Sequence, residues 1–175
     1  MILHYFIKKE NKDKKIANKI YFSLIKFVKL VLSKNDLKIK KEFNSSFELM
    51  TIFLFTIFFS YKKKINNNHI NQYLMDLYII DLDKSLRELG IGDLRIGKYV
   101  KLYVKKIYYR IYKLEMIFKN KDFSEFEKYI EKINIQSQSD NLVFLSRYLF
   151  DVINSLLKRS KKEHLSEFTF NYTHN

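Results

Sequence analysis

The distribution of helix-breaking residues constrains the fold of this chain more than any other feature. The 175 residues include no proline, and the three glycines all lie between positions 90 and 97. Proline breaks helices because it lacks a backbone N–H and clashes with the preceding turn, and glycine weakens them through its backbone freedom. Apolar residues recur at intervals of three and four elsewhere, as in amphipathic helices. We therefore predict an all-α fold, a single compact irregular bundle of about six helices.

The apolar spacing also locates the helices. A second helix is expected to begin at Ser45, which has capping-box spacing to Glu48. Its apolar run Leu49–Phe59 would span only about 16 Å as a helix, against about 30 Å for a bilayer core, so we expect it to be buried at the centre of the bundle. Five other helices are predicted. Two cover residues 16–31 and 69–89, and the remaining three begin between residues 93 and 98, at about 122–124, and near 142. Residues 1–159 would form one domain, and residues 160–175 a polar, flexible tail.

The charge of the chain limits its partners less sharply. Its formal net charge is +14, which suggests nucleic acid, a ribosome or an anionic membrane surface as a partner. Abundant Lys, Asn, Ile, Phe and Tyr are also typical of an AT-rich genome, and such composition drift is the alternative explanation. There is no cysteine, which excludes disulfides, thiolate metal ligands and thiol nucleophiles. The four histidines lack metal-site spacing. We expect no cofactor, no metal and no enzymatic activity.

The glycine cluster predicts a tight corner between two helices. Gly90 at the left-handed position after a helix would close a Schellman motif, with Ile91 packing back on Leu86. Asp93 is a candidate N-cap for the next helix. Gly97, in or just before the first turn of that helix, would permit the close approach of another element.

The polar residues around this corner are ordered on the helix. Asp83 and Arg87 have the favourable i,i+4 spacing, whereas Asp81 lies on the opposite side from Asp76 and Asp83, so these acids cannot bind one metal ion. Residues 76–98 hold five acids and four bases, although the chain as a whole is strongly basic. A phosphate-binding surface would show the reverse, so a protein partner is favoured at this corner.

One further cluster has two interpretations. Tyr103, Tyr108, Tyr109 and Tyr112 lie among lysines and could stack on nucleic-acid bases. Tyrosines at helical spacing are more often the edge of a core, which is the alternative reading.

The stretch from Leu77 to Lys101 resembles the signature of the ubiquinol–cytochrome c chaperone family. Its distinctive parts are Leu86-Arg87-Glu88, then Gly90-Ile91-Gly92-Asp93, then Gly97-Lys98. Weaker similarity extends over residues 20–157. One departure is Tyr108-Tyr109-Arg110, where family members tend to have Tyr-Gly-Arg.

The resemblance implies a helical, non-enzymatic assembly factor that binds newly made cytochrome b and promotes assembly of ubiquinol–cytochrome c reductase (complex III). A second assembly factor is a further implied partner, and the lysine-rich exterior could contact a ribosome or an anionic membrane. With no presequence evident, we expect a bacterial protein, cytoplasmic and peripheral to the inner membrane, or one at the mitochondrial matrix face if organellar. The alternatives are a basic helical ribosome- or RNA-binding module and a helical scaffold without a client. The residues expected to bind the partner are Asp76, Asp83, Arg87, Glu88, Gly90, Gly92, Asp93, Arg95, Gly97 and Lys98.

Overall fold

The computed structural model describes residues 2–61 and 68–171, and these residues form a helical bundle. These residues contain no β-strand, although an isolated antiparallel bridge joins Ile39 to Gln136. The all-α prediction is confirmed. The helices are α1 (Ile2–Ser33), α2 (Phe43–Tyr61), α3 (Asn68–Glu88), α4 (Asp93–Asn120), α5 (Phe123–Ile133) and α6 (Leu142–Lys162), with short 3-10 turns η1 (Asn35–Leu37) and η3 (Ser139–Asn141).

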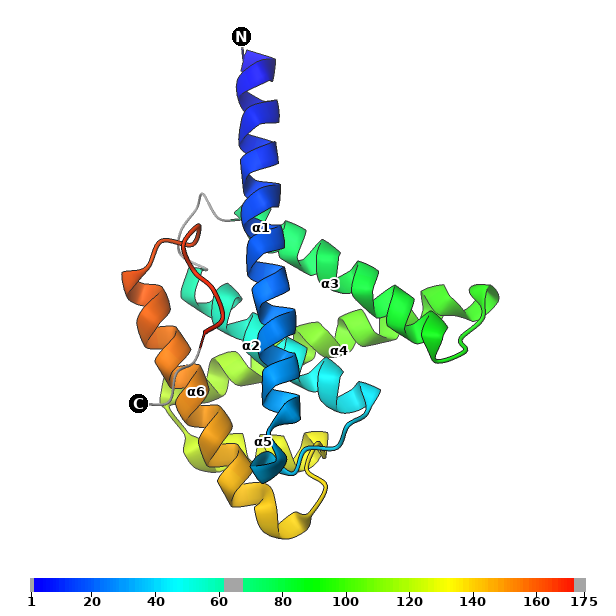
Figure 1. Ribbon diagram of the computed structural model, residues 1–175, viewed down its shortest axis with the longest axis vertical. Coiled ribbons are helices and arrows are strands. Elements are labelled where there is room, and N and C mark those ends of the chain that lie inside the picture. Colours follow the sequence, from blue (N-terminus) through cyan, green and yellow to red (C-terminus); the bar gives the residue numbers. More distant parts are fainter. Residues whose placement is uncertain (1, 62–67, 172–175) are drawn as a thin grey trace.

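The centre of the bundle is α2, which the other helices surround (Figure 1). It packs against α1, α3, α4 and α6, as expected for a helix that is apolar on nearly every side. By length and composition α2 could cross a membrane, but 67% of its most apolar window is buried inside the bundle. The predicted central helix is confirmed. Its fully buried members include Leu49, Ile52, Phe53, Leu54, Phe55 and Ile57.

The start of α2 differs from the prediction. The helix begins at Phe43, and the Ser45 hydroxyl is buried without a hydrogen-bond partner among the described residues. The Glu48 carboxylate pairs with Arg110 of α4 instead of reaching back to the helix start. The predicted capping box is therefore wrong, because a tertiary ion pair takes the acid that the local motif requires. Asn44 secures this end of α2 by donating to the carbonyl of Ile133 at 3.2 Å.

Two pairs of helices flank α2, and α1 packs on α3 and α2. α5 and α6 pack on each other, and an aromatic cluster of Phe118, Phe126 and Phe150 joins them to the end of α4. α3 and α4 form a hairpin that runs to one side, with its connecting corner at the edge of the molecule (Figure 1). The corner is thus kept clear of α5 and α6.

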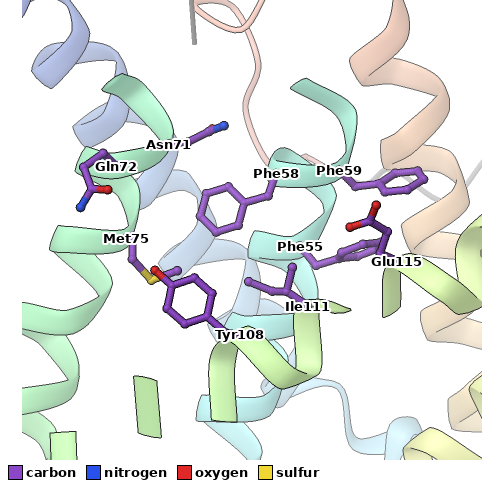
Figure 2. Close-up of a pocket in the computed structure, with 9 residues that line it drawn as sticks. All are labelled: Phe55, Phe58, Phe59, Asn71, Gln72, Met75, Tyr108, Ile111 and Glu115. Carbon is purple, nitrogen blue, oxygen red and sulfur yellow. The ribbon is translucent and has the colours of Figure 1, made fainter. Parts of the chain in front are cut away.

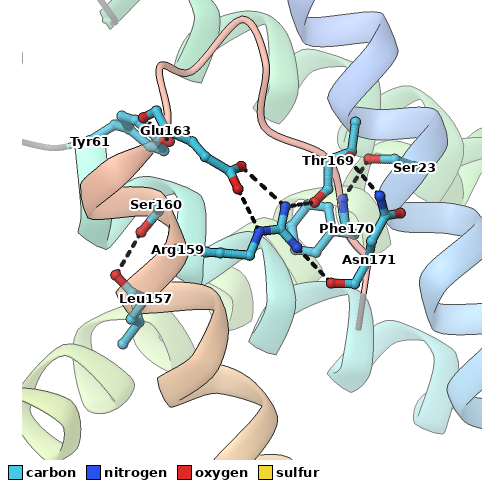
Figure 3. Close-up of polar contacts among 9 residues, drawn as sticks. All are labelled: Ser23, Tyr61, Leu157, Arg159, Ser160, Glu163, Thr169, Phe170 and Asn171. Atoms are coloured by element: carbon cyan, nitrogen blue, oxygen red, sulfur yellow. Dashed lines mark hydrogen bonds and ion pairs between the residues drawn. The ribbon is translucent and has the colours of Figure 1, made fainter. Parts of the chain in front are cut away.

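The segment after α6 is packed on the bundle rather than frayed. Phe168 contacts Tyr61, and Phe170 contacts Phe27 with ring centroids 6.0 Å apart. Arg159 donates to the carbonyls of Thr169 and Asn171, each at 2.6 Å (Figure 3). The expectation of a flexible tail from residue 160 is wrong for residues 160–171, and residues 172–175 lie outside the described part. The reason is apolar burial, since Leu165, Phe168 and Phe170 are all buried.

We expect Phe168→Ala to lower the free energy of unfolding by about 3–5 kcal/mol, because a fully buried aromatic ring is lost. Phe144→Ala is the matched control, since Phe144 is 54% exposed and its truncation should change stability by less than about 0.5 kcal/mol. Urea denaturation of both variants measures the difference. Equal stabilities would mean that the tail does not pack on the helices.

Candidate functional site

The corner between α3 and α4 has the backbone geometry that its glycine predicts. Gly90 has φ +86°, in the left-handed region. Its N–H donates to the carbonyl of Arg87 at 2.8 Å, and the N–H of Ile91 donates to the carbonyl of Leu86 at 3.2 Å. These two bonds define a Schellman motif, so that prediction is confirmed. Ile91 is half-buried and packs against the core, which anchors the corner.

Two other local predictions at the corner are wrong. The N-cap of α4 is Gly92, whose carbonyl accepts from the N–H groups of Arg95 and Ile96, and Asp93 is the first helical residue. A side chain at Gly97 would meet nothing within 4 Å. No close approach inside the described chain therefore requires this glycine, although glycine in a helix destabilises it by about 0.5–1 kcal/mol relative to alanine.

The charged residues of the corner are organised around Arg87. Its Nε donates to Asp83 Oδ1 at 2.8 Å, and its Nη1 donates to Asp93 across the turn. The two carboxylates raise the pKa of Arg87. Because Arg87 is exposed, these ion pairs contribute little to stability. They do orient the three side chains relative to one another, joining the end of α3 to the start of α4.

The residues predicted to bind the partner do not all lie close together in the structure. Asp76 accepts a hydrogen bond from Gln72 at 2.8 Å and lies about 20 Å along α3 from the corner. Glu88, Arg95 and Lys98 lie exposed at the corner itself. Asp83, Arg87, Asp93 and the two glycines Gly90 and Gly92 form a compact group.

Exposed apolar side chains flank the corner, and the sequence reading missed them. Leu94 is fully exposed and Leu89 is 58% exposed, while Ile80, about 15 Å back along α3, is 52% exposed. Leu94 shares a helical face with Lys98 and Lys101, away from the buried face that carries Ile96 and Ile107. The position of Leu94 on the helical wheel, opposite the apolar face of α4, is the sequence feature that could have predicted its exposure.

The four tyrosines considered as a stacking platform do not share one face of α4. Tyr103 packs inward against Phe43 and Phe47, with its ring centroid 4.9 Å from that of Phe47. Tyr108, Tyr109 and Tyr112 are exposed. The stacking platform considered from the sequence therefore lacks one member, which belongs to the edge of the core.

A buried ion pair holds α4 against α2. Arg110 donates to the Glu48 carboxylate through Nη2 at 3.0 Å and Nε at 3.1 Å. The side chain of Glu48 is 3% exposed and that of Arg110 is 15% exposed. Burial raises the pKa of Glu48, with Arg110 opposing the shift. The pair fixes the rotation of α4, and so determines which of its residues face solvent.

A small apolar pocket of about 330 Å³ lies between α2, α3 and α4. Figure 2 shows the rings of Phe55, Phe58 and Tyr108 around it, with Met75 and Ile111 between them. Its polar rim includes Glu115, which pairs with Lys119 at 2.8 Å. The pocket suits an apolar side chain of a protein partner better than a charged substrate. Within residues 2–61 and 68–171, no group of three potential metal ligands was found.

An exposed corner with charged and apolar surface, together with an apolar pocket further along the same helix hairpin, is typical of a helical protein that binds other proteins. The chain belongs to the ubiquinol–cytochrome c chaperone family, whose model matches residues 35–165. This match confirms the resemblance noted in the sequence and assigns the chain to the chaperones of complex III assembly. The fold is also that of the crystal structure of the Cbp3 homolog from Brucella abortus, with a TM-score of 0.80 and 20% identity over 98% of this chain and 97% of that one. No curated protein matched the sequence.

The two glycines of the corner should respond oppositely to alanine. Gly90→Ala should destabilise the fold by about 1–2 kcal/mol, because a side chain is strained at its positive φ. Gly97→Ala should stabilise it by about 0.5–1 kcal/mol, since the site is helical and open. Chemical denaturation separates the two. A loss of stability at Gly97 would show that the helix needs the bare backbone there.

The buried pair predicts a pH-dependent variant. Arg110→Met leaves Glu48 buried without its counter-ion and should lower stability by about 3 kcal/mol at neutral pH. The folded-state pKa of Glu48 then lies further above its unfolded value, so stability is present at low pH and is lost as pH rises through the folded pKa. Denaturation midpoints across pH measure this. The double variant Glu48→Gln/Arg110→Met is the control and should lack this pH dependence.

Proposed function

We propose that this chaperone binds newly made cytochrome b and promotes its assembly into complex III, without catalysing a reaction. The observation that carries the proposal is the family match, which spans α2 to α6 and includes the whole α3–α4 corner. Cytochrome b is a membrane protein, and its apolar segments need a partner before assembly. The exposed apolar residues and the small pocket are suited to such a client.

The α3–α4 corner is the surface we assign to the client. Its ion cluster of Asp83, Arg87 and Asp93 offers both signs of charge, and Leu89 and Leu94 lie exposed beside it. Gly97 adds an open stretch of helix backbone that a partner can approach closely. A surface of mixed charge with exposed leucines favours a protein client, since a polyphosphate ligand would require an excess of basic residues.

The proposal extends to location and to a second partner. The chaperone would work at the face of the membrane where cytochrome b is made, peripheral to the bacterial inner membrane or on the matrix side in an organelle. A second assembly factor remains a prediction from the family resemblance.

The test is capture of cytochrome b by two matched variants. Leu94→Glu should reduce the amount of newly synthesised cytochrome b that co-purifies with the tagged chaperone by about tenfold, because a desolvated apolar contact is replaced by a charge. Val143→Glu is the control, since Val143 is 57% exposed on α6 and should leave capture unchanged. Quantitative mass spectrometry of the eluate gives the ratio, and denaturation curves establish that both variants fold.

Other outcomes would contradict this proposal in different ways. Equal capture by both variants would place the client elsewhere on the molecule. Recovery of ribosomal components without cytochrome b would favour the RNA-binding alternative. Unchanged complex III levels in a deletion strain would favour a scaffold without a client.

A further inference from the structure

The solvent side of α4 carries an unusual combination of residues. Four lysines, Lys98, Lys101, Lys105 and Lys113, lie exposed on one stripe of the helix. At 100° per residue they share this stripe with six exposed apolar or aromatic residues, Leu94, Leu102, Tyr108, Tyr109, Tyr112 and Met116. We call this stripe the α4 outer face. It is the reverse of the side that packs on α2 and α3.

The charge of this helix is strongly one-sided. α4 contains eight basic and two acidic residues. Both acids lie off the α4 outer face and are engaged, Asp93 by Arg87 and Glu115 by Lys119. The outer face therefore presents positive charge without an acid among its members, which is complementary to an anionic surface.

The apolar residues of this face are exposed to a degree that packing within the chain does not explain. Tyr112 is 60% exposed, Leu102 is 48% exposed and Met116 is 46% exposed. They recur along a straight helix of 28 residues, about 42 Å long, which presents them as one elongated strip. Exposed apolar side chains gathered on one strip mark an interaction surface.

The strip continues into a cleft of about 250 Å³ between α4 and α5. Lys113 lines this cleft together with Lys128 and Lys132 of α5. Its two acids have partners, since Glu125 pairs with Lys128 at 2.8 Å and Asp122 caps α5 by accepting from the Glu125 N–H. The cleft holds more basic than acidic side chains, and so extends the positive charge of the α4 outer face.

We propose that the α4 outer face docks the protein on an anionic lipid bilayer. The lysines would contact lipid phosphates, the tyrosines would lie at headgroup depth, and Leu102 and Met116 would enter the first part of the acyl region. A bilayer fits better than RNA because leucine and methionine gain little from stacked bases but gain by leaving water among acyl chains. The inference rests on the proposed location at a membrane face, although its test uses no client.

The first experiment measures co-sedimentation of the full chain with vesicles of phosphatidylcholine containing phosphatidylglycerol, and with vesicles of phosphatidylcholine alone. The triple variant Lys101→Gln, Lys105→Gln, Lys113→Gln should weaken binding to the anionic vesicles about 100-fold. Each lysine that contacts anionic lipid is expected to raise the affinity about fivefold. Lys26→Gln, Lys158→Gln, Lys161→Gln is the charge-matched control on α1 and α6, and it should weaken binding far less. Leu102→Ser with Met116→Ser should weaken binding several-fold at unchanged charge.

The second experiment locates the face directly. The chain contains no tryptophan, so Tyr112→Trp supplies a single fluorescent reporter on the α4 outer face. Its emission should shift to the blue on adding anionic vesicles and should be quenched by brominated acyl chains. Phe144→Trp on α6 is the matched control and should show neither change.

Three results would overturn the proposal. These are equal sedimentation with neutral and anionic vesicles, equal loss in the two lysine triples, or a shift for Phe144→Trp but none for Tyr112→Trp. Binding to single-stranded RNA but not to vesicles, unaffected by Leu102→Ser and Met116→Ser, would assign the face to nucleic acid instead. Because no cytochrome b is present, failure here leaves the client assignment at Leu94 standing, and failure of client capture leaves the vesicle result standing.

Discussion

The fold depends on the burial of α2, a helix with almost no polar side. Such a helix is stable in water only when other helices surround it, and α1, α3, α4 and α6 do so. Its apolar side chains, roughly 1.5–3 kcal/mol each when fully buried, supply much of the driving force for the bundle. The same length and composition would permit a membrane span, so it is the packing around α2 that makes it a core.

A buried ion pair interrupts this apolar core, and it affects the surface more than the stability. Glu48 is the acid of α2, and its pair with Arg110 fixes the rotation of α4. Burial raises the pKa of Glu48, which means that holding its charge inside the protein is unfavourable. A pair of this kind specifies an arrangement rather than adding much stability. The arrangement it specifies directs Ile107 and Leu114 inward and the lysines and tyrosines of α4 outward.

The α3–α4 corner and the outer side of α4 are adjacent but chemically different. The corner has charges of both signs that neutralise one another around Arg87, and its exposed leucines lie beside them. The outer side of α4 is positive throughout, with tyrosines between its lysines. This division allows one helix hairpin to contact a protein at its tip and an anionic surface along its length. The two surfaces meet at Leu94 and Lys98, whereas Lys101, Leu102, Lys105 and Met116 lie further along α4 and belong to the outer side alone.

Local patterns predicted local structure well and tertiary consequences poorly. The absence of proline determined long helices, apolar periodicity determined their approximate ranges, and Gly90 determined a Schellman turn, because each of these depends on neighbours in the chain. The family signature likewise lies in one continuous stretch. Three local predictions were wrong because side chains have partners that a local pattern does not include. Glu48 pairs with Arg110 instead of completing the Ser45 cap, and Asp93 pairs with Arg87 instead of capping α4. Phe168 packs on Tyr61, which holds the segment predicted to be a flexible tail. The spacing of apolar residues in α4 indicates its buried side, but only the tertiary structure decided that Tyr103 belongs to the core and Tyr108, Tyr109 and Tyr112 to the surface. The physical reason is that α2 supplies Phe43 and Phe47, the rings against which Tyr103 packs.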